Sequence, residues 1–235
     1  MGPTDQSPSP AASLEEALHR FGVRLDPERS ALLDKYRALL WEWNERLNLT
    51  RHTTFEKFVG RDVVDSLQLS ALIPPGRRVV DIGSGSGVPG LILAICRPDL
   101  RVALCDSTQK KARVLQSMAE QLGAPAEVHG CRVEELLALR TFDVATARAV
   151  APLAKLLTWL EPHWEAVDEL LVIKGRNWAE ERGEARHRGL LKRLELRRAA
   201  VYPMPEGDGE SVVLRLWPKG RFSQGHGEDA GRDSA

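Results

Sequence analysis

The stretch 79-VVDIGSGSGVPG-90 decides the fold of this chain, and the apolar residues 91-LILA-94 follow it directly. A short apolar run that leads into closely spaced glycines and then into a second apolar run predicts a strand, a tight turn and a helix. Glycine accepts positive φ and lets a ligand approach the backbone, and the first turn of a helix presents free N–H groups. We therefore expect a nucleotide-like ligand at this turn.

The glycine pattern alone leaves two classes of ligand open. Residues 85-GSGVPG-90 satisfy G-x-G-x-x-G, the dinucleotide fingerprint, and Asp106 follows the next expected strand, 101–105, where an acid accepts ribose hydroxyls. Asp81, however, precedes the first glycine, and an acid there suits a ligand with a positive charge better than a pyrophosphate. S-adenosylmethionine joins a nucleoside to a cationic sulfonium and an amino acid, so we favour it. A glycine-rich turn that binds nothing is the remaining alternative.

Bulk composition sets the class of protein. A chain of 235 residues with 43% hydrophobic content suits one α/β domain with an extension. Lys plus Arg and Asp plus Glu number 33 each, so any basic surface for a nucleic acid must be local. The three cysteines fall in apolar segments without C-x-x-C spacing, which indicates buried thiols in a reducing compartment. With no apolar run near the ~20 residues of a membrane span, we expect a cytoplasmic protein that uses neither a membrane nor a metal.

The chain divides at changes in composition. Its first residues are rich in Pro and Ser, whereas apolar residues recur at three- and four-residue spacing over 32–47, which predicts an amphipathic helix. The segment 74-PPG-76 ends this helical region before the glycine stretch. We predict a disordered N-terminus (1–12), a helical N-terminal extension (13–76), a catalytic domain (77–219) and a disordered tail (220–235).

Strands and helices alternate from residue 77 onward, which predicts a parallel sheet with right-handed crossovers. Residues 194–202 and 211–217 then both have strand patterns, separated by prolines and glycines with no room for a helix. They should pair antiparallel. Five parallel strands closed by such a hairpin form the α/β, Rossmann-like, seven-stranded sheet of class I S-adenosylmethionine-dependent methyltransferases, and we expect that fold here.

The segment after the fourth expected strand, 147-ARAVA-151, constrains the methyl acceptor. It lacks the Asn/Asp-Pro-Pro-aromatic motif that accompanies methylation of exocyclic base amines, and a thiol nucleophile for pyrimidine C5 is not evident. Arg148 is its prominent polar group and can pair with a carboxylate or a phosphate, or form a surface salt bridge. Glu134, in the turn after the third strand, suits an adenine contact or an acidic helix start equally well.

Seven motifs in order along the chain resemble those of the bacterial 16S ribosomal RNA guanine-N7 methyltransferases, also called the glucose-inhibited division protein B family. They are 44-NERLNLT-50, 65-DS-66, 81-DIGSGSGVPG-90, 106-DSTQKK-111, 132-RVEE-135, 147-ARA-149 and 174-KG-175. The resemblance implies transfer of the methyl group of S-adenosylmethionine to N7 of a guanine in the 530 loop of 16S ribosomal RNA. It also implies a protein that acts on this RNA or on the small ribosomal subunit, and we expect a monomer.

The same resemblance suggests the site residues. The expected cofactor positions are Gly83, Gly85, Gly87, Val88, Asp106, Val133, Glu134 and Arg148. The expected substrate positions are Asn48, Thr50, Arg61 and Lys174, although Asn48 and Thr50 also suit a plain helix end. The family usually has His three residues before its Asp-Ser pair, whereas Asp62 stands there in this chain, after Arg61. Arg61 could take over part of the work of that His.

The chemistry of guanine N7 bears on catalysis. N7 carries a lone pair and no hydrogen, so its methylation needs positioning and desolvation rather than a general base, and we assign no acid or base. Residues 176–198 hold eight Lys or Arg against four Glu, which suits either an RNA-binding rim or a solvated helix face. Two alternatives stay open: a methyltransferase for another RNA or a small molecule, and a non-catalytic nucleotide-binding module.

Overall fold

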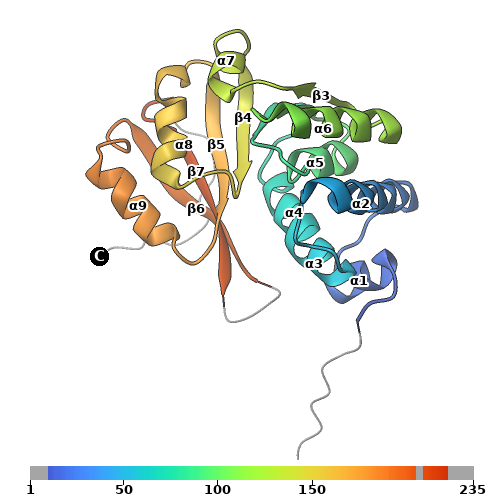
Figure 1. The fold of residues 1–235 in the computed structure, drawn as a ribbon. Helices are drawn as coiled ribbons and strands as arrows, with labels where there is room; N and C mark the ends of the chain where they lie inside the picture. The colour runs from blue at the N-terminus through green and yellow to red at the C-terminus, as the bar shows by residue number, and fades with distance from the viewer. Residues whose placement is uncertain (1–9, 205–208, 222–235) are drawn as a thin grey trace, which may run out of the picture.

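The computed structural model describes residues 10–204 and 209–221, which form a seven-stranded sheet with helices on both faces (Figure 1). The strands are β1 (Arg78–Ile82), β2 (Arg101–Cys105), β3 (Ala126–His129), β4 (Phe142–Arg148), β5 (Val167–Lys174), β6 (Leu194–Pro203) and β7 (Glu210–Pro218). Their order is β3-β2-β1-β4-β5-β7-β6. The first five run parallel, and β7 pairs antiparallel with both β5 and β6. The expected sheet is confirmed, and the last strand lies between β5 and β6.

The helices of the sheet domain follow the strands in the expected alternation. They are α5 (Gly90–Cys96), α6 (Gln109–Leu122), α7 (Val133–Leu137), α8 (Leu153–Leu160), the short 3-10 helix η2 (Glu161–His163) and α9 (Trp178–His187). In Figure 1, α7, α8 and α9 lie on one side of the sheet and α5 and α6 on the other. Neighbouring strand residues point to opposite faces, so Val79 packs with α5 while Val80 packs with α8.

The N-terminal region is helical. It contains α1 (Leu14–Arg20), α2 (Pro27–Leu47) and a continuous helical stretch made of α3 (Phe55–Lys57), the π-helix η1 (Phe58–Val63) and α4 (Val64–Ser70). The hydroxyl of Ser13 accepts a hydrogen bond from the backbone of Glu16, and Asp26 caps α2, whose first residue is Pro27. These are the N-cap types that satisfy free N–H groups at a helix start.

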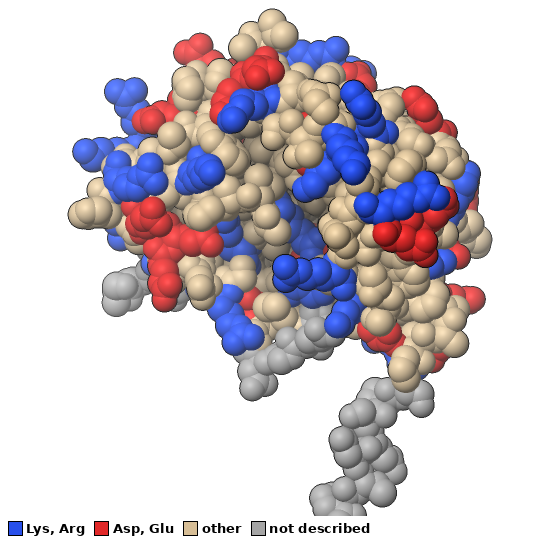
Figure 2. All heavy atoms as spheres, viewed as in Figure 1, with Lys and Arg blue, Asp and Glu red and all other residues tan. Residues whose placement is uncertain are grey.

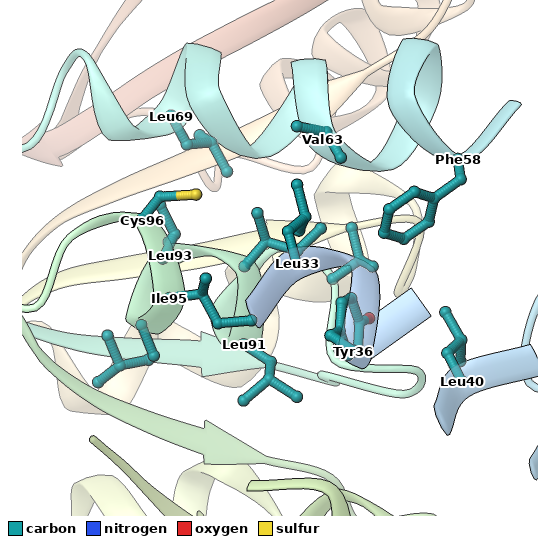
Figure 3. Close-up of a cluster of buried hydrophobic side chains, with 14 of the residues drawn as sticks. Leu33, Tyr36, Leu40, Phe58, Val63, Leu69, Leu91, Leu93, Ile95 and Cys96 are labelled. Carbon is teal, nitrogen blue, oxygen red and sulfur yellow. The ribbon is translucent and has the colours of Figure 1, made fainter. Parts of the chain in front are cut away.

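This extension shares one hydrophobic core with the sheet domain. Figure 3 shows Leu33 and Tyr36 of α2 beside side chains of α5, under the helical stretch that ends in α4, with Leu40 farther along α2. All three α2 side chains are fully buried. Removing each from water contributes about 1.5–3 kcal/mol, so the packing holds α2 firmly against the start of α5.

Residues near both ends of the chain make specific contacts with the folded domain, and residues 1–9 and 222–235 lie outside the described residues. Ala11 is buried in the core, and its backbone N–H donates to the Glu56 carboxylate. Arg221 donates from Nη1 to the carbonyl oxygen of Val167, at 2.6 Å. The backbone N–H of Ala11 and the guanidinium of Arg221 thus bind partners that are far away in sequence, which composition alone does not reveal.

No helix within the described ranges is both long and apolar enough to cross a membrane.

Candidate functional site

The glycine turn follows β1 and is hydrogen-bonded to the carboxyl end of β2. The backbone N–H groups of Gly83 and Ser84 both donate to the carbonyl oxygen of Cys105, at 2.7 and 3.1 Å. Gly83, Gly85 and Gly87 all have positive φ, at 67°, 55° and 103°. A Cβ on Gly83 would lie 2.7 Å from Val150, whereas one on Gly85 would have no neighbour closer than 3.7 Å. The backbone at Gly85 is therefore accessible to a ligand.

Asp81, near the end of β1, is bound by groups of the protein itself. Its side chain is fully buried and accepts hydrogen bonds from the backbone N–H of Gly90, at 3.1 Å, and from the hydroxyl of Thr146, at 2.9 Å. Burial raises its pKa to about 6, against the lowering effect of these donors. Asp81 thus ties the start of α5 to β1 and β4, and its predicted role toward a positively charged ligand stays a prediction.

Asp106 lies beside the turn, where the sequence predicts an acid for ribose. Its two carboxylate oxygens accept the backbone N–H groups of Gly85, at 2.9 Å, and Thr108, at 2.8 Å. A carboxylate offers about four acceptor positions, so two remain for hydroxyl donors. The carboxylate is held in place before any ligand arrives.

A hollow opens next to the turn, where the carboxyl ends of β1 and β2 lie near α7, α8 and the segment after β4. Among the described residues, its lining consists of Ile82, Gly83, Cys105, Ser107, Cys131, Arg132, Val133, Glu134, Val150 and Trp159. Val133 is buried and Glu134 half-buried at the start of α7. The thiol of Cys105 contacts the carbonyl oxygen of Cys131, and burial raises its pKa, so it is not an activated nucleophile. Apolar and aromatic side chains thus line this hollow beside the backbone of Gly83.

Arg148, the last residue of β4, holds together segments that are far apart in sequence. Its Nη1 lies 2.7 Å from Asp62 Oδ1 and its Nε lies 2.7 Å from Asp65 Oδ2. His52 Nδ1 donates to the same Asp62 oxygen at 2.7 Å, and the hydroxyl of Tyr202 donates to Asp65 Oδ1 at 2.7 Å. We call these five residues the Arg148 cluster.

We use the term crevice for the hollow together with the carboxyl ends of β1, β2 and β4 beside it. The Arg148 cluster keeps a charged group at the edge of this crevice. The two aspartates are almost fully buried, with 2% and 1% of their side chains exposed. Burial lowers the pKa of the Arg148 guanidinium, but Asp62 and Asp65 outweigh this and raise it overall. An arginine has five N–H donors, so the two ion pairs leave three of them for a ligand.

The motif 44-NERLNLT-50 positions His52 of this cluster. The side-chain oxygen of Asn44 accepts the backbone N–H of Thr50 at 2.8 Å, and the Thr50 hydroxyl accepts the backbone N–H of His52 at 3.0 Å. Asn48 takes the left-handed conformation, with φ 47°, and ends α2. The structure thus gives Asn48 and Thr50 their structural role, and their predicted contact with substrate stays a prediction.

Arg61 and Lys174, the two other predicted substrate residues, differ in their surroundings. Arg61 is half-buried in η1, and its Nη1 is buried without a hydrogen-bond partner among the described residues. Lys174 is buried at the end of β5, and its Nζ lies 2.7 Å from both the Ala151 carbonyl oxygen and the Glu181 carboxylate. Lys174 is therefore engaged within the protein, where it supports the segment after β4.

These groups meet because the carboxyl ends of the parallel strands form one edge of the sheet. Figure 2 shows Lys and Arg side chains within and around a hollow at the centre of the face where Figure 1 places the end of β4. Across the described ranges, no group of three or more His, Cys, Asp or Glu side chains is arranged to hold a metal ion.

The comparisons with known proteins agree with this geometry. The GidB family, described as rRNA small subunit methyltransferase G, matches residues 29–202. The chain belongs to this family. A Ribosomal RNA small subunit methyltransferase G of Rhodopirellula baltica is 50% identical to this GidB chain over 193 residues, 82% of the chain and 84% of the relative. One of Nitrosococcus oceani is 34% identical over 207 residues, 88% and 94% of the two chains.

Solved structures support the same fold for the GidB chain. A mutant of MtNAS in complex with S-adenosylmethionine matches 88% of the chain and 84% of its own length, with a TM-score of 0.53 and 19% identity. TrmK of M. capricolum in complex with S-adenosyl-homocysteine matches 66% and 68%, with a TM-score of 0.51 and 13% identity. The GidB chain thus has the Rossmann-like fold of these structures, and its family membership makes it a methyltransferase.

Sequence reasoning missed four residues of the GidB site. Tyr36 reads as a core residue of α2, yet its hydroxyl donates to the Ser86 carbonyl oxygen of the glycine turn at 2.9 Å. His52, Trp159 and Tyr202 lie in three separate segments and have no spacing in common. Of the four, only His52 carried a usable signal, because it follows a polar motif that exceeds the needs of a helix end.

Proposed function

We propose that this protein transfers the methyl group of S-adenosylmethionine to N7 of a guanine in the 530 loop of 16S ribosomal RNA. The observation that carries the proposal is the hollow at the glycine turn, together with Arg148 at the end of the neighbouring strand β4, which two ion pairs keep charged. A permanently protonated guanidinium cannot act as a base. N7 attack needs none, and membership of the GidB family supports ribosomal RNA as the acceptor.

The cofactor site follows from the residues already described. The hollow lined by Val133 and Glu134 would hold the adenine, and the free acceptor positions of Asp106 would receive the ribose hydroxyls. The three unused N–H donors of Arg148 suit the carboxylate at the amino-acid end. When bound, the cofactor supplies an activated methyl group on a cationic sulfonium.

The protein itself contributes position and exclusion of water. Guanine N7 and O6 both accept hydrogen bonds, so a donor on N7 would block the reaction. The base must therefore be held by its ring face and its other edge, after it is splayed out of the loop. Arg61 precedes Asp62 of the Arg148 cluster and carries an unpaired buried donor, so it is our first candidate for a substrate contact. Asn48 and Thr50, in the segment that positions His52, are further candidates.

We further propose that the protein acts as a monomer in the cytoplasm, on 16S ribosomal RNA or on the small ribosomal subunit. Lys174 supports the segment after β4 through its contacts with Ala151 and Glu181, and its contact with substrate stays a prediction.

Labelled methyl transfer tests the proposal directly. Small ribosomal subunits and 16S RNA that lack the modification are incubated with the enzyme and labelled S-adenosylmethionine, and the product is mapped by strand cleavage at N7-methylguanine. We expect one labelled guanine in the 530 loop. A label elsewhere in RNA, or only in a small molecule, would replace the acceptor. Binding of S-adenosylhomocysteine without any transfer would leave a nucleotide-binding module.

A further inference from the structure

A groove between α9 and the beginning of β6 gathers positive charge away from the crevice. Four cationic side chains line it: Arg182, Arg186, Lys192 and Lys219. Its remaining described lining consists of three leucines and one carboxylate, at Leu191, Leu194, Leu196 and Glu195, and its volume is about 350 Å³. We call it the basic groove. In Figure 2, Lys and Arg side chains also gather at the left edge, where Figure 1 places α9.

Among the described residues that line the basic groove, four cations stand against one carboxylate. Arg182 and Arg186 lie one helical turn apart, and like charges at this spacing destabilise a helix. Within the described ranges none of the four cations forms an ion pair, and the Arg182 guanidinium instead lies 5.0 Å from the centre of the Trp178 ring. Four cations that converge on one concave surface with a single carboxylate among its described lining favour an anionic ligand.

Strand register places the groove at the far end of the sheet from the crevice. Leu194 of β6 pairs with Pro218, whereas Val201 pairs with Val212, which in turn pairs with Lys174 at the carboxyl end of β5. The stretch from Leu194 to Val201 spans about 20 Å at the usual rise per strand residue. A single nucleotide in the crevice cannot reach the groove, but a folded RNA can.

We propose that the basic groove binds the phosphate backbone of the RNA substrate about 20 Å from the methylated guanine. This proposal rests on the proposed function, because it takes RNA as the acceptor. Guanidinium groups match phosphate oxygens in geometry. The leucine floor and Trp178 give apolar surface for a ribose or a base beside the cations. The groove therefore recognises an extended RNA rather than the target loop alone.

A charge-removal experiment tests the groove. The variant Arg186→Gln/Lys192→Gln removes two exposed cations, and the matched control Arg24→Gln/Arg101→Gln removes two exposed arginines elsewhere. Methylation of full-length 16S RNA is measured at several salt concentrations. Each lost phosphate contact lowers the salt slope of log(kcat/KM) by about 1, so we expect a decrease of about 2 and a KM for RNA raised about 10-fold near physiological salt.

Four readouts decide the outcome. We expect kcat and the KM for S-adenosylmethionine to match the control, and a short hairpin that carries only the target loop to show no difference between the variants. A KM and salt slope equal to the control on full-length RNA would overturn the groove as an RNA site. So would weaker binding to anionic lipid vesicles with unchanged RNA kinetics. Failure of the proposed function would appear separately, as wild-type enzyme that does not methylate this RNA.

Discussion

Buried aspartates occur in two regions of this molecule, and their partners differ in charge. Asp81, fully buried behind the glycine turn, meets only neutral donors, the Gly90 N–H and the Thr146 hydroxyl. Asp62 and Asp65, buried to a similar degree, meet the guanidinium of Arg148. The first arrangement anchors a helix to the sheet. In the second arrangement, two carboxylates hold a cation at the carboxyl end of β4, where we propose that it binds the cofactor.

Removal of the Arg148 guanidinium should have the largest effect on the region with charged partners. In Arg148→Ala, both aspartates stay buried without their partner, and we expect a loss of about 3–5 kcal/mol in the free energy of unfolding and no detectable methyl transfer. Urea unfolding and labelled transfer measure the two effects. The control Arg113→Ala, on an exposed face of α6, should change neither. A stable Arg148→Ala variant with normal transfer would contradict the role given to this residue.

Substitutions at two glycines compare the part of the turn that faces open space with the part that packs against Asp81. Gly85 faces open space beside Asp106, so Gly85→Val should weaken S-adenosylhomocysteine binding about 100-fold. In Gly90→Ala the new Cβ would lie 2.3 Å from Leu104 and 2.7 Å from Asp81, and we expect about 1–3 kcal/mol lower stability. Calorimetric binding and thermal unfolding measure both. Unchanged affinity in Gly85→Val would show that the ligand lies elsewhere.

The titration of Asp81 sharpens the contrast through pH. Its pKa is raised in the folded protein from 3.8 to about 6, so the folded state binds the proton more tightly and stability falls as pH rises from about 4 to about 6. Asp81→Asn removes this effect and keeps both hydrogen bonds possible. We expect the stability of the variant relative to wild type to increase by about 2 kcal/mol between about pH 4 and about pH 7. A difference that does not change with pH would refute this.

His52 should have the smallest effect. His52→Ala removes one of the two donors to Asp62 Oδ1 but leaves the Arg148 ion pair, so we expect about a 5- to 10-fold weaker affinity for S-adenosylhomocysteine, near 1 kcal/mol. The neighbouring exposed Thr53→Ala serves as control. A double-mutant cycle with Arg148→Lys should give a non-zero coupling energy, and strict additivity would remove His52 from the cluster.

The two regions also differ in how far the sequence reveals them. The glycine turn is local: a strand, positive-φ glycines and the acid after the next strand all have fixed spacings, so the turn, the parallel direction of the first five strands and Asp106 follow from the pattern. The Arg148 cluster joins the loop after α2, η1, α4, β4 and β6, and no spacing connects them. Motif resemblance brought Arg148 and the Asp65-Ser66 pair to attention, but the links through His52 and Tyr202 required coordinates.

A pattern also reports residue type more readily than direction. Asp81 stands at the place where an acid could meet a ligand, but the alternation of the strand turns it inward toward Thr146. Lys174 likewise belongs to a basic set, yet the end of β5 directs it toward Ala151 and Glu181. Both side chains are buried, and burial depends on the helices that cover each face of the sheet, which the local pattern does not report.

Binding of S-adenosylhomocysteine to a charge-neutral version of the Arg148 cluster tests the central claim most directly. In Asp62→Asn/Asp65→Asn/Arg148→Met no buried charge is left without a partner, so we expect cooperative unfolding with stability close to wild type. Isothermal titration should nevertheless show affinity about 30-fold or more below wild type, because the guanidinium donors are gone. Wild-type affinity in this folded variant would contradict the claim that Arg148 is held in the cluster in order to bind the cofactor.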